Sequence, residues 1–215
     1  GSLFVARRGE NSDGHDYLDA AAQNGAVAAI VEHLCDSPLT QIVVEDSTIA
    51  LGELARAYLS DLRSHQKLDV IAMTGSVGKT TTKDLLAAIM SADAPTVAPQ
   101  LSFNNEVGLP LTVLRADEST RHLVLEMGAS GPGHIAYLTR IAPPDAGIEL
   151  MDGHAHLGGF GSVEGVRDTK AELIQGLVPS GSSILNFDDP HVMEMAAYAP
   201  GRVVTFSASG NSQAD

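Results

Sequence analysis

The stretch from Thr74 to Thr81, Thr-Gly-Ser-Val-Gly-Lys-Thr-Thr, constrains the fold of this chain more than any other part of the sequence. A short apolar run at residues 70–73 precedes it, and a helical pattern at residues 83–90 follows it. A strand, a glycine loop and a helix start in this order form a phosphate cradle, because free N–H groups and the helix dipole favour negative charge there. The alternative is a glycine turn before an ordinary helix, and the Gly-Lys-Thr order in this context argues against it.

The residues of this loop have separate expected tasks. The glycines let the backbone wrap an anion, Lys79 reaches the outer phosphates, and the hydroxyl of Thr80 coordinates Mg²⁺. We expect the nucleotide to be bound by the residues of the loop, namely Gly75, Ser76, Val77, Gly78, Lys79, Thr80 and Thr81. Only two residues separate the glycines, so the loop is shorter than the general phosphate-loop pattern.

The composition of the chain limits its partners. With a net charge of −14 over 215 residues, the surface repels nucleic acid and anionic lipid, although solubility alone also accounts for such acidity. The single cysteine, Cys35, excludes an internal disulfide and indicates a reducing compartment. No run approaches the ~20 apolar residues of a membrane span, and no signal segment is recognisable at the start. We therefore expect a cytoplasmic protein with no nucleic-acid partner and no membrane insertion.

Apolar runs alternate with helical patterns along the chain. Before the phosphate loop, apolar runs lie at residues 3–6, 27–31 and 42–44, and helical patterns at residues 17–24 and about 48–64. Beyond the loop, apolar runs lie at residues 122–125, 146–148, 183–185 and 203–206, and helical patterns at residues 135–141, 163–177 and 191–198. Continuous apolar strands separated by helices indicate an α/β fold with a mostly parallel sheet covered on both faces. Ligands of such sheets bind beyond the carboxyl ends of the strands.

A polar segment at residues 64–67 indicates a domain boundary. It follows a helix that Ser47 or Thr48 is expected to cap. We therefore predict an N-terminal domain at residues 1–67 and a second domain, which contains the phosphate loop, at residues 68–215.

Glu126 ends the apolar strand expected at residues 122–125. Downstream of a phosphate loop, such a carboxylate supplies a hard oxygen ligand for Mg²⁺ or positions a metal-bound water. A strand-end glutamate taken alone is more often just solvated. Because the loop lies upstream, we predict a metal-binding role.

Several motifs, in order along the chain, resemble those of the Mur ligase family, the ATP-dependent amide-bond formers of bacterial cell-wall synthesis. The loop at residues 75–81 is similar to the shortened phosphate loop of that family. The other similar segments are the first-domain motifs at residues 1–9 and 13–16, the asparagine-rich loop at 103–112, the acidic strand end at 125–129, the histidine loop at 155–162, the lysine helix at 170–172, and the strand and turn at 185–190. The asparagine and histidine loops resemble the branch that adds D-alanyl-D-alanine to UDP-N-acetylmuramoyl-tripeptide.

The resemblance implies a reaction and its participants. ATP converts the terminal carboxylate of the tripeptide to an acyl phosphate, and the amine of D-alanyl-D-alanine then displaces phosphate, in peptidoglycan precursor synthesis. Such phosphoryl transfer depends on positioning and charge neutralisation. The expected cofactors are ATP and two Mg²⁺ ions, and the expected assembly is a monomer. Residues 1–67 are expected to recognise the UDP part of the substrate, and residues 68–215 to form part of the central ATPase domain.

The resemblance also assigns roles that the residues alone do not suggest. It makes His156 and Lys170 catalytic residues beside Lys79, and metal ligands beside Thr80 and Glu126. A second Mg²⁺ then lies near His156 and bridges the γ-phosphate to the substrate carboxylate. The residues alone indicate a loop histidine and a solvated lysine, since Mg²⁺ prefers oxygen ligands. In the family the matching lysine is carbamoylated by CO₂, which turns a cation into an anion beside the metals, and we predict the same for Lys170.

Two further sites have competing interpretations. Asn104 and Asn105 are expected to contact the substrate or the transferring phosphate, although asparagine-rich loops are often only turns. Asp13 or Asp16 either caps a helix or contributes to the UDP pocket, and we favour the cap.

The chain departs from the family pattern in two respects. Met151 stands where the family has asparagine, Asp152 and His154 replace less polar or smaller residues, and Glu149 lies where an apolar residue is expected. The sequence also stops at Asp215, inside the middle domain of the family, so we expect this chain not to complete the ligation alone. The alternatives are a ligase of another specificity, including the folylpolyglutamate type, and a non-catalytic nucleotide-binding fragment.

Overall fold

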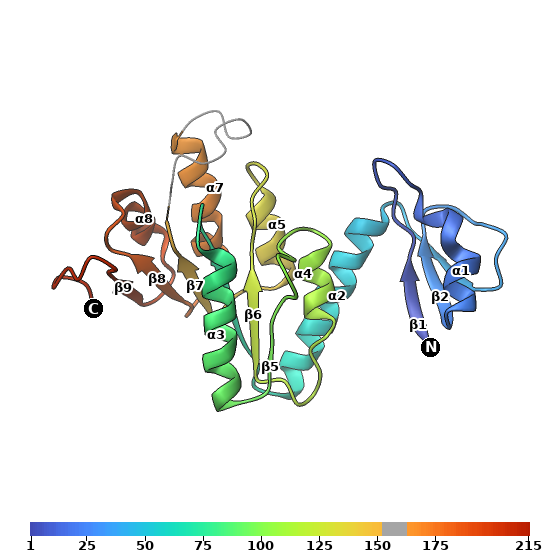
Figure 1. The fold of residues 1–215 in the computed structure, drawn as a ribbon, viewed down its shortest axis with the longest axis horizontal. Helices are drawn as coiled ribbons and strands as arrows, with labels where there is room; N and C mark the ends of the chain where they lie inside the picture. The colour runs from blue at the N-terminus through green and yellow to red at the C-terminus, as the bar shows by residue number, and fades with distance from the viewer. Residues whose placement is uncertain (152–162) are drawn as a thin grey trace. The chain divides into compact units, whose positions relative to one another are not determined.

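Six parallel strands form the sheet that carries the phosphate loop, in the order β5-β6-β4-β7-β8-β9 (Figure 1). The computed structural model describes residues 1–151 and 163–215. The strands are β4 (Asp69–Thr74), β5 (Thr96–Val97), β6 (His122–Glu126), β7 (Ala146–Glu149), β8 (Ser182–Asn186) and β9 (Val203–Phe206). Every neighbouring pair is parallel, as the apolar runs separated by helices predict.

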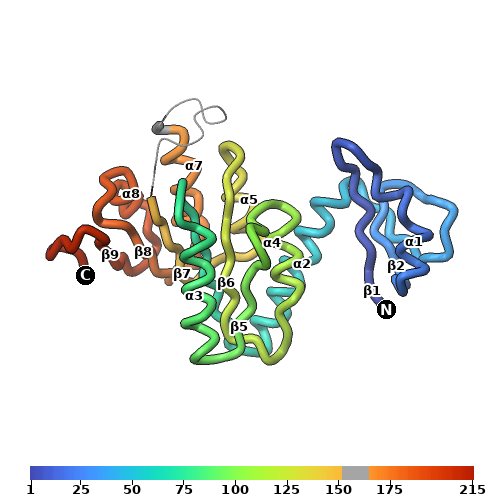
Figure 2. The backbone as a smooth tube through the Cα atoms, viewed as in Figure 1, coloured from blue at the N-terminus to red at the C-terminus, as the bar shows by residue number. Residues whose placement is uncertain are grey.

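Helices connect these strands and cover the sheet. They are α2 (Ser47–His65), α3 (Lys79–Asp93), α4 (Gly108–Val113), α5 (His134–Ile141), α7 (Val163–Gln175), α8 (Pro190–Glu194) and the 3₁₀ helix η2 (Met195–Tyr198). α3 runs alongside β6, as Figures 1 and 2 show. None of the described helices is long and apolar enough to span a membrane.

Alternate residues of β4 show that both faces of this sheet are covered. Val70 and Ala72 belong to one cluster of buried side chains with residues of α2, α4 and α5. The intervening Ile71 and Met73 point to the opposite face, since strand side chains alternate, and they are buried as well. Apolar residues therefore fill both faces of this strand, and in such sheets ligands bind beyond the carboxyl ends of the strands.

The chain divides into two compact units, Gly1–Leu54 and Ala55–Asp215. The first contains β1 (Ser2–Val5), the 3₁₀ helix η1 (Gly14–Tyr17), α1 (Leu18–Gln23), β2 (Ala26–Val31) and β3 (Thr40–Val43). Its strands form a parallel sheet in the order β1-β2-β3. Gly25 follows α1 with a φ of 91°, a left-handed conformation that ends the helix at little cost. The assignment of residues 1–67 and 68–215 to two functional domains stays a prediction.

The start of α2 differs from the prediction. Asp46, not Ser47 or Thr48, caps the helix, because its Oδ1 accepts hydrogen bonds from Thr48 N at 2.7 Å and Ile49 N at 2.9 Å. Ser47 instead donates from both N and Oγ to Glu32 Oε1, at 3.1 Å and 2.9 Å. Only one side chain can cap the free amides at the start of the helix, and Asp46 takes that role. Ser47 is instead held by Glu32, a residue distant in the sequence.

Two short elements were not predicted from the sequence. β5 contains only two residues and leaves too short a pattern to recognise. α4 begins within the expected asparagine-rich loop at residues 103–112 and ends one residue beyond it. Its Pro110 is tolerated because it stands in the first turn of the helix.

Candidate functional site

The turn between β4 and α3 has the backbone of a phosphate loop. Gly75 has a φ of 150° and Gly78 a φ of 85°, backbone angles that residues other than glycine rarely adopt. A Cβ atom at Gly75 would also lie 2.9 Å from the Cβ atom of Leu150, which directly follows β7, so there is no room for a side chain at this position. Ser76 N donates to Met151 O at 2.8 Å and ties the loop to the end of the neighbouring strand.

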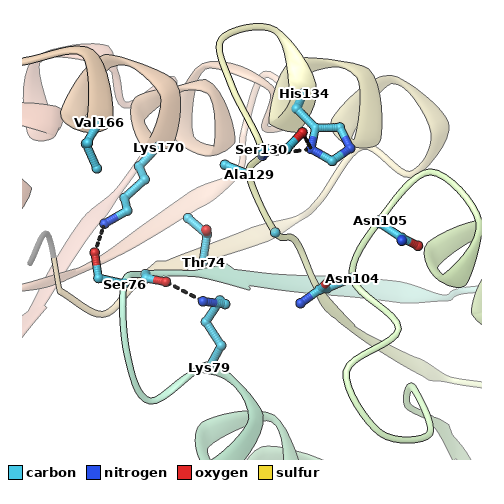
Figure 3. Close-up of a pocket in the computed structure, with 12 residues that line it drawn as sticks. Thr74, Ser76, Lys79, Asn104, Asn105, Ala129, Ser130, His134, Val166 and Lys170 are labelled. Atoms are coloured by element: carbon cyan, nitrogen blue, oxygen red, sulfur yellow. Dashed lines mark hydrogen bonds between the residues drawn. The ribbon is translucent and has the colours of Figure 1, made fainter. Parts of the chain in front are cut away.

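Lys79 begins α3 and folds back over the loop. Its Nζ donates to Gly75 O at 2.6 Å (Figure 3). Burial lowers the pKa of the Lys79 ammonium, the Lys170 cation adds to that effect, and the carboxylates of Glu126 and Glu149 oppose it. The ammonium therefore lies among other charges at the mouth of the loop, where a phosphate would supply its counter-charge.

Glu126 lies beside the loop, as predicted. It ends β6, which pairs with β4 so that Glu126 is the register partner of Met73. Thr80 Oγ1 donates to Glu126 Oε2 at 3.1 Å, and Asn104 Nδ2 donates to Glu126 Oε1 at 2.8 Å. The Glu126 carboxylate is almost completely buried, with 1% of the residue exposed.

These groups fit Mg²⁺. A hydroxyl and a carboxylate are hard oxygen ligands, and Mg²⁺ in nucleotide sites takes only one or two protein ligands besides phosphates and water. Among the described residues no group of three or more His, Cys, Asp or Glu side chains is arranged to hold a metal ion, so a metal held by such ligands alone has no candidate site there. Thr80 and Glu126 are thus suited to a metal that arrives with a phosphate.

Two adjoining pockets open at this place. One, of about 270 Å³, is lined by residues from four parts of the sheet edge, including Lys79, Asn104, His134 and Lys170 (Figure 3). The other, of about 340 Å³, lies over the phosphate loop and includes Thr80, Glu126 and Ser102. Ser76, Lys79 and Asn104 line both, so a nucleotide in the second pocket and an acceptor in the first would meet at these side chains.

Lys170 is placed against the phosphate loop. It lies on α7 with 5% of the residue exposed, so the alternative of a solvated lysine is wrong. Its Nζ donates to Ser76 Oγ at 2.6 Å and to Met151 O at 3.1 Å. α7 therefore reaches the same loop that Lys79 and Thr80 belong to, across a long interval of sequence.

The two asparagines have different surroundings. Asn104 accepts a hydrogen bond from Gly128 N at 2.8 Å through its main-chain oxygen and directs its amide at Glu126. Asn105 Oδ1 accepts from Gly108 N at 2.9 Å, the arrangement of a cap at the start of α4. Asn105 therefore caps the turn before α4 and also lines the pocket of about 270 Å³, so its contact with the substrate stays a prediction, while Asn104 belongs to the metal side of the site.

Other predicted residues lie elsewhere. Asp13 Oδ1 accepts from His15 N at 2.9 Å and caps η1, which confirms the capping prediction. His156, together with Asp152 and His154, lies outside the described residues. Their roles stay predictions.

Two residues near this site, Ser102 and Lys83, were not predicted from the sequence. Ser102 Oγ lies 3.3 Å from Thr80 Oγ1. Lys83 has only 3% of its residue exposed, although a lysine in an amphipathic helix is ordinarily solvated. The one available signal was the three-residue spacing from Thr80, which places Lys83 on the same face of α3.

Comparison with known proteins identifies the family. A family model described as the Mur ligase middle domain matches residues 73–215. A Mycobacterium leprae UDP-N-acetylmuramoyl-tripeptide–D-alanyl-D-alanine ligase is 43% identical over 99% of this chain and 45% of its own length. An Escherichia coli ligase of the same name is 39% identical over 88% of this chain and 41% of its own length. The chain thus spans less than half the length of these curated relatives.

Solved structures show the same likeness. MurF from Acinetobacter baumannii superposes with a TM-score of 0.89 at 35% identity, covering 98% of this chain and 46% of that one. MurF ligase from Thermotoga maritima, solved in complex with ADP, has a TM-score of 0.87 at 37% identity, covering 98% and 48%.

Proposed function

This chain belongs to the Mur ligase family, and on that premise we propose that it forms the nucleotide-binding part of a ligase that adds D-alanyl-D-alanine to UDP-N-acetylmuramoyl-tripeptide. The observation that carries the proposal is the pairing of Thr80 with Glu126 at 3.1 Å, directly beside the phosphate loop. The names of its relatives supply the substrates, and the site supplies the chemistry for activating them.

The reaction has two steps. An oxygen of the tripeptide carboxylate forms a bond to the γ-phosphorus of ATP, and ADP leaves. The amine of D-alanyl-D-alanine then bonds to the acyl carbon, inorganic phosphate leaves with the electrons of the broken C–O bond, and the amine loses a proton. The protein contributes mainly position and charge to such steps.

The residues divide these tasks. The loop from Gly75 to Gly78 presents main-chain N–H groups to the β- and γ-phosphates, and Lys79 neutralises charge on the transferring group. Thr80 and Glu126 would hold one Mg²⁺, which would neutralise negative charge on the phosphates. Asn104 donates a hydrogen bond to Glu126 Oε1 and so fixes the orientation of the carboxylate.

We propose carbamoylation of Lys170 on the same basis. Its neutral amine would bond to the carbon of CO₂ and release a proton, leaving a carbamate anion that would offer oxygen ligands to a metal. The position supports this, because Lys170 is buried against Ser76 and close enough to Lys79 to affect its pKa. Intact mass in bicarbonate tests it: an added carbamoyl mass that Lys170→Ala abolishes is expected, and an unmodified mass with Mg²⁺ and nucleotide present contradicts it.

The remaining assignments concern the whole protein. We propose that residues 1–67 bind the UDP part of the substrate, and that the ligase is a cytoplasmic monomer, since ATP and UDP-linked precursors are cytoplasmic. The molar mass measured by light scattering at several protein concentrations tests whether the protein is a monomer. A mass that rises with concentration contradicts it.

The decisive test is acceptor specificity, measured with an intact ligase that carries this chain. Phosphate release from ATP is followed with UDP-N-acetylmuramoyl-tripeptide and either D-alanyl-D-alanine, D-alanine, or no acceptor. We expect release that depends on the dipeptide. Release with a UDP-N-acetylmuramoyl-dipeptide and a single amino acid would assign another specificity, and absence of any release beside normal ATP binding would indicate a non-catalytic module.

A further inference from the structure

The loop between β5 and α4 borders the candidate metal site, next to Thr80 on α3 and Glu126 on β6. It carries Ser102, 3.3 Å from Thr80 Oγ1, and Asn104, which donates to Glu126 at 2.8 Å. Both side chains line the pocket over the phosphate loop. Residues 98–107 contain neither helix nor strand, so hydrogen bonds to other segments hold this loop, among them the one from Gly128 N to Asn104 O at 2.8 Å.

Lys83 on α3 anchors this loop through hydrogen bonds to its main chain. It lies on α3 three residues after Thr80, on the same helix face. Its Nζ donates to Pro99 O at 3.1 Å and Leu101 O at 3.2 Å, and it pairs with Asp84 Oδ1 at 2.7 Å. An ammonium has three donors, so these acceptors use all of them.

The loop needs such an anchor. Leu101 has a φ of 54°, a left-handed conformation that costs a leucine about 1 kcal/mol or more. Its side chain gains nothing from packing, since 79% of the residue is exposed. The hydrogen bond from Lys83 to Leu101 O stabilises the turn, and the next residue, Ser102, then faces Thr80.

We propose that Lys83 is a positioning residue for the Mg²⁺-nucleotide site, an inference that rests on the proposed function. It fixes the carbonyls at residues 99 and 101, and through them it places Ser102 and Asn104 against the Thr80–Glu126 pair. Ser102 Oγ then offers an additional oxygen to a metal-bound water, and Asn104 orients the carboxylate. Lys83 itself lines neither pocket, so its effect passes through the loop.

The effect of this residue is measurable as a change in what Mg²⁺ adds to nucleotide binding. Lys83→Met removes the three donors and keeps an apolar stem of similar length. Lys67→Met is the matched control, because the Lys67 side chain is 84% exposed and lies away from the site. ADP affinity of the 215-residue chain is measured by calorimetry with excess Mg²⁺ and with a chelator.

We expect Lys83→Met to reduce the gain in ADP affinity caused by Mg²⁺ by about tenfold, as loss of a group that orients metal ligands does. The metal-free affinity should stay within about twofold, since the phosphate loop itself is untouched. Ser102→Ala should reduce the Mg²⁺-dependent gain in ADP affinity when Lys83 is present. The reduction should be smaller in the Lys83→Met background, because Lys83 acts by positioning Ser102.

Three outcomes overturn the inference. The first is an unchanged Mg²⁺ effect in Lys83→Met, even with a lowered melting temperature, which would make Lys83 a purely structural anchor. The second is an equal loss with and without Mg²⁺. If Lys83→Met does not fold, a normal Mg²⁺ effect in both Ser102→Ala and Asn104→Ala is the third. Failure of the nucleotide-binding part of the proposed function is distinguishable, because wild type itself would then bind no ADP, and failure of the acceptor assignment would leave the effect of Lys83→Met unchanged.

Discussion

At the carboxyl edge of the six-stranded sheet, where β4 and β6 end, polar side chains line two pockets beside the phosphate loop, whereas around Asp145 at the amino edge they link the sheet to its helices. Thr80, Glu126, Lys79 and Lys170 all line one or both pockets of the carboxyl edge. The glycines of the phosphate loop adopt positive φ, which glycine does at little steric cost, and this lets the backbone turn beside these pockets.

The amino edge shows the opposite arrangement. Asp145 precedes β7, accepts from Val70 N at 2.7 Å and forms an ion pair with Arg63. Arg63 Nη1 also donates to Pro143 O at 3.0 Å, and His122 Nε2 lies 3.0 Å from Asp93 Oδ2. These contacts join the start of the sheet to α2 and α3, so Asp145, Arg63 and His122 have structural tasks there.

The difference teaches that charge at one edge serves ligand binding and charge at the other serves stability. A buried or half-buried group that is fully paired contributes to folding, while removing one partner leaves the other unsatisfied. Groups that face a pocket are instead satisfied by the ligand. Substitutions at the two edges should therefore separate affinity from stability.

The largest expected effect is at the carboxyl edge. Lys79→Ala should weaken Mg²⁺-ADP binding by about 100-fold, because it removes a charge aimed at the phosphates. The melting temperature should change little, since the phosphate is the natural partner of this ammonium. Calorimetry and thermal unfolding measure the two quantities, with the exposed Lys67→Ala as the control. Equal affinity of Lys79→Ala and wild type would remove the nucleotide site from the proposal.

The next effect is at the amino edge. Asp145→Ala should lower the free energy of unfolding by about 2 kcal/mol, because Val70 N and Arg63 lose their acceptor. Mg²⁺-ADP affinity should stay the same. Urea unfolding measures the change, and Asp61→Ala, at an acid whose side chain is 71% exposed, is the control. If Asp145→Ala lost Mg²⁺-ADP affinity while its free energy of unfolding stayed unchanged, the contrast between the two edges would be wrong.

A smaller effect is expected at Glu126. Glu126→Gln keeps the shape and one oxygen acceptor, and should raise the Mg²⁺ concentration needed for half-maximal ADP binding by about tenfold. Metal-free ADP binding should be preserved, because the main-chain cradle does not involve this residue. A Mg²⁺ titration of ADP binding measures it, with the exposed Glu118→Gln as the control. An unchanged Mg²⁺ requirement would exclude Glu126 as a metal ligand.

The smallest effect tests a part of the carboxyl edge that serves structure. Hydrogen bonds from Ser209 and Ser207 and from the Ala208 amide lower the pKa of Asp188 to about 2. A carboxyl group whose pKa is lower in the folded state stabilises the fold above its unfolded pKa of about 3.9, and loses that contribution as pH falls toward 2. The Ala208 amide resonance should titrate near pH 2 and should not titrate there in Asp188→Asn. A midpoint near 4 would contradict the contacts.

Much of the fold could be predicted because its signals are local. The strand, glycine loop and helix at residues 70–90 appear in one continuous stretch, and β6 to β9 were expected from short apolar runs. The start of α2 was predicted wrongly because Glu32, far away in sequence, takes Ser47 from its expected role. β5 was missed because two residues form no pattern.

The candidate site shows the same division. Lys79, Thr80 and Glu126 were predicted from the loop and from the strand that ends in an acid, and the structure brings them together. Lys170 was predicted only through the family resemblance, because nothing in its helical pattern indicates that it is buried. Its position depends on α7 packing over the loop.

By itself the sequence determined the parallel α/β fold, the phosphate loop and the acid beside it, since backbone propensity and glycine conformation act within a few residues. Only the tertiary structure decided the roles of Asp46, Lys83 and Ser102. Their surroundings come from strand register and loop closure, which join residues far apart in the chain. The physical reason is that a hydrogen bond or an ion pair forms between neighbours in space, and the sequence orders residues only along the chain.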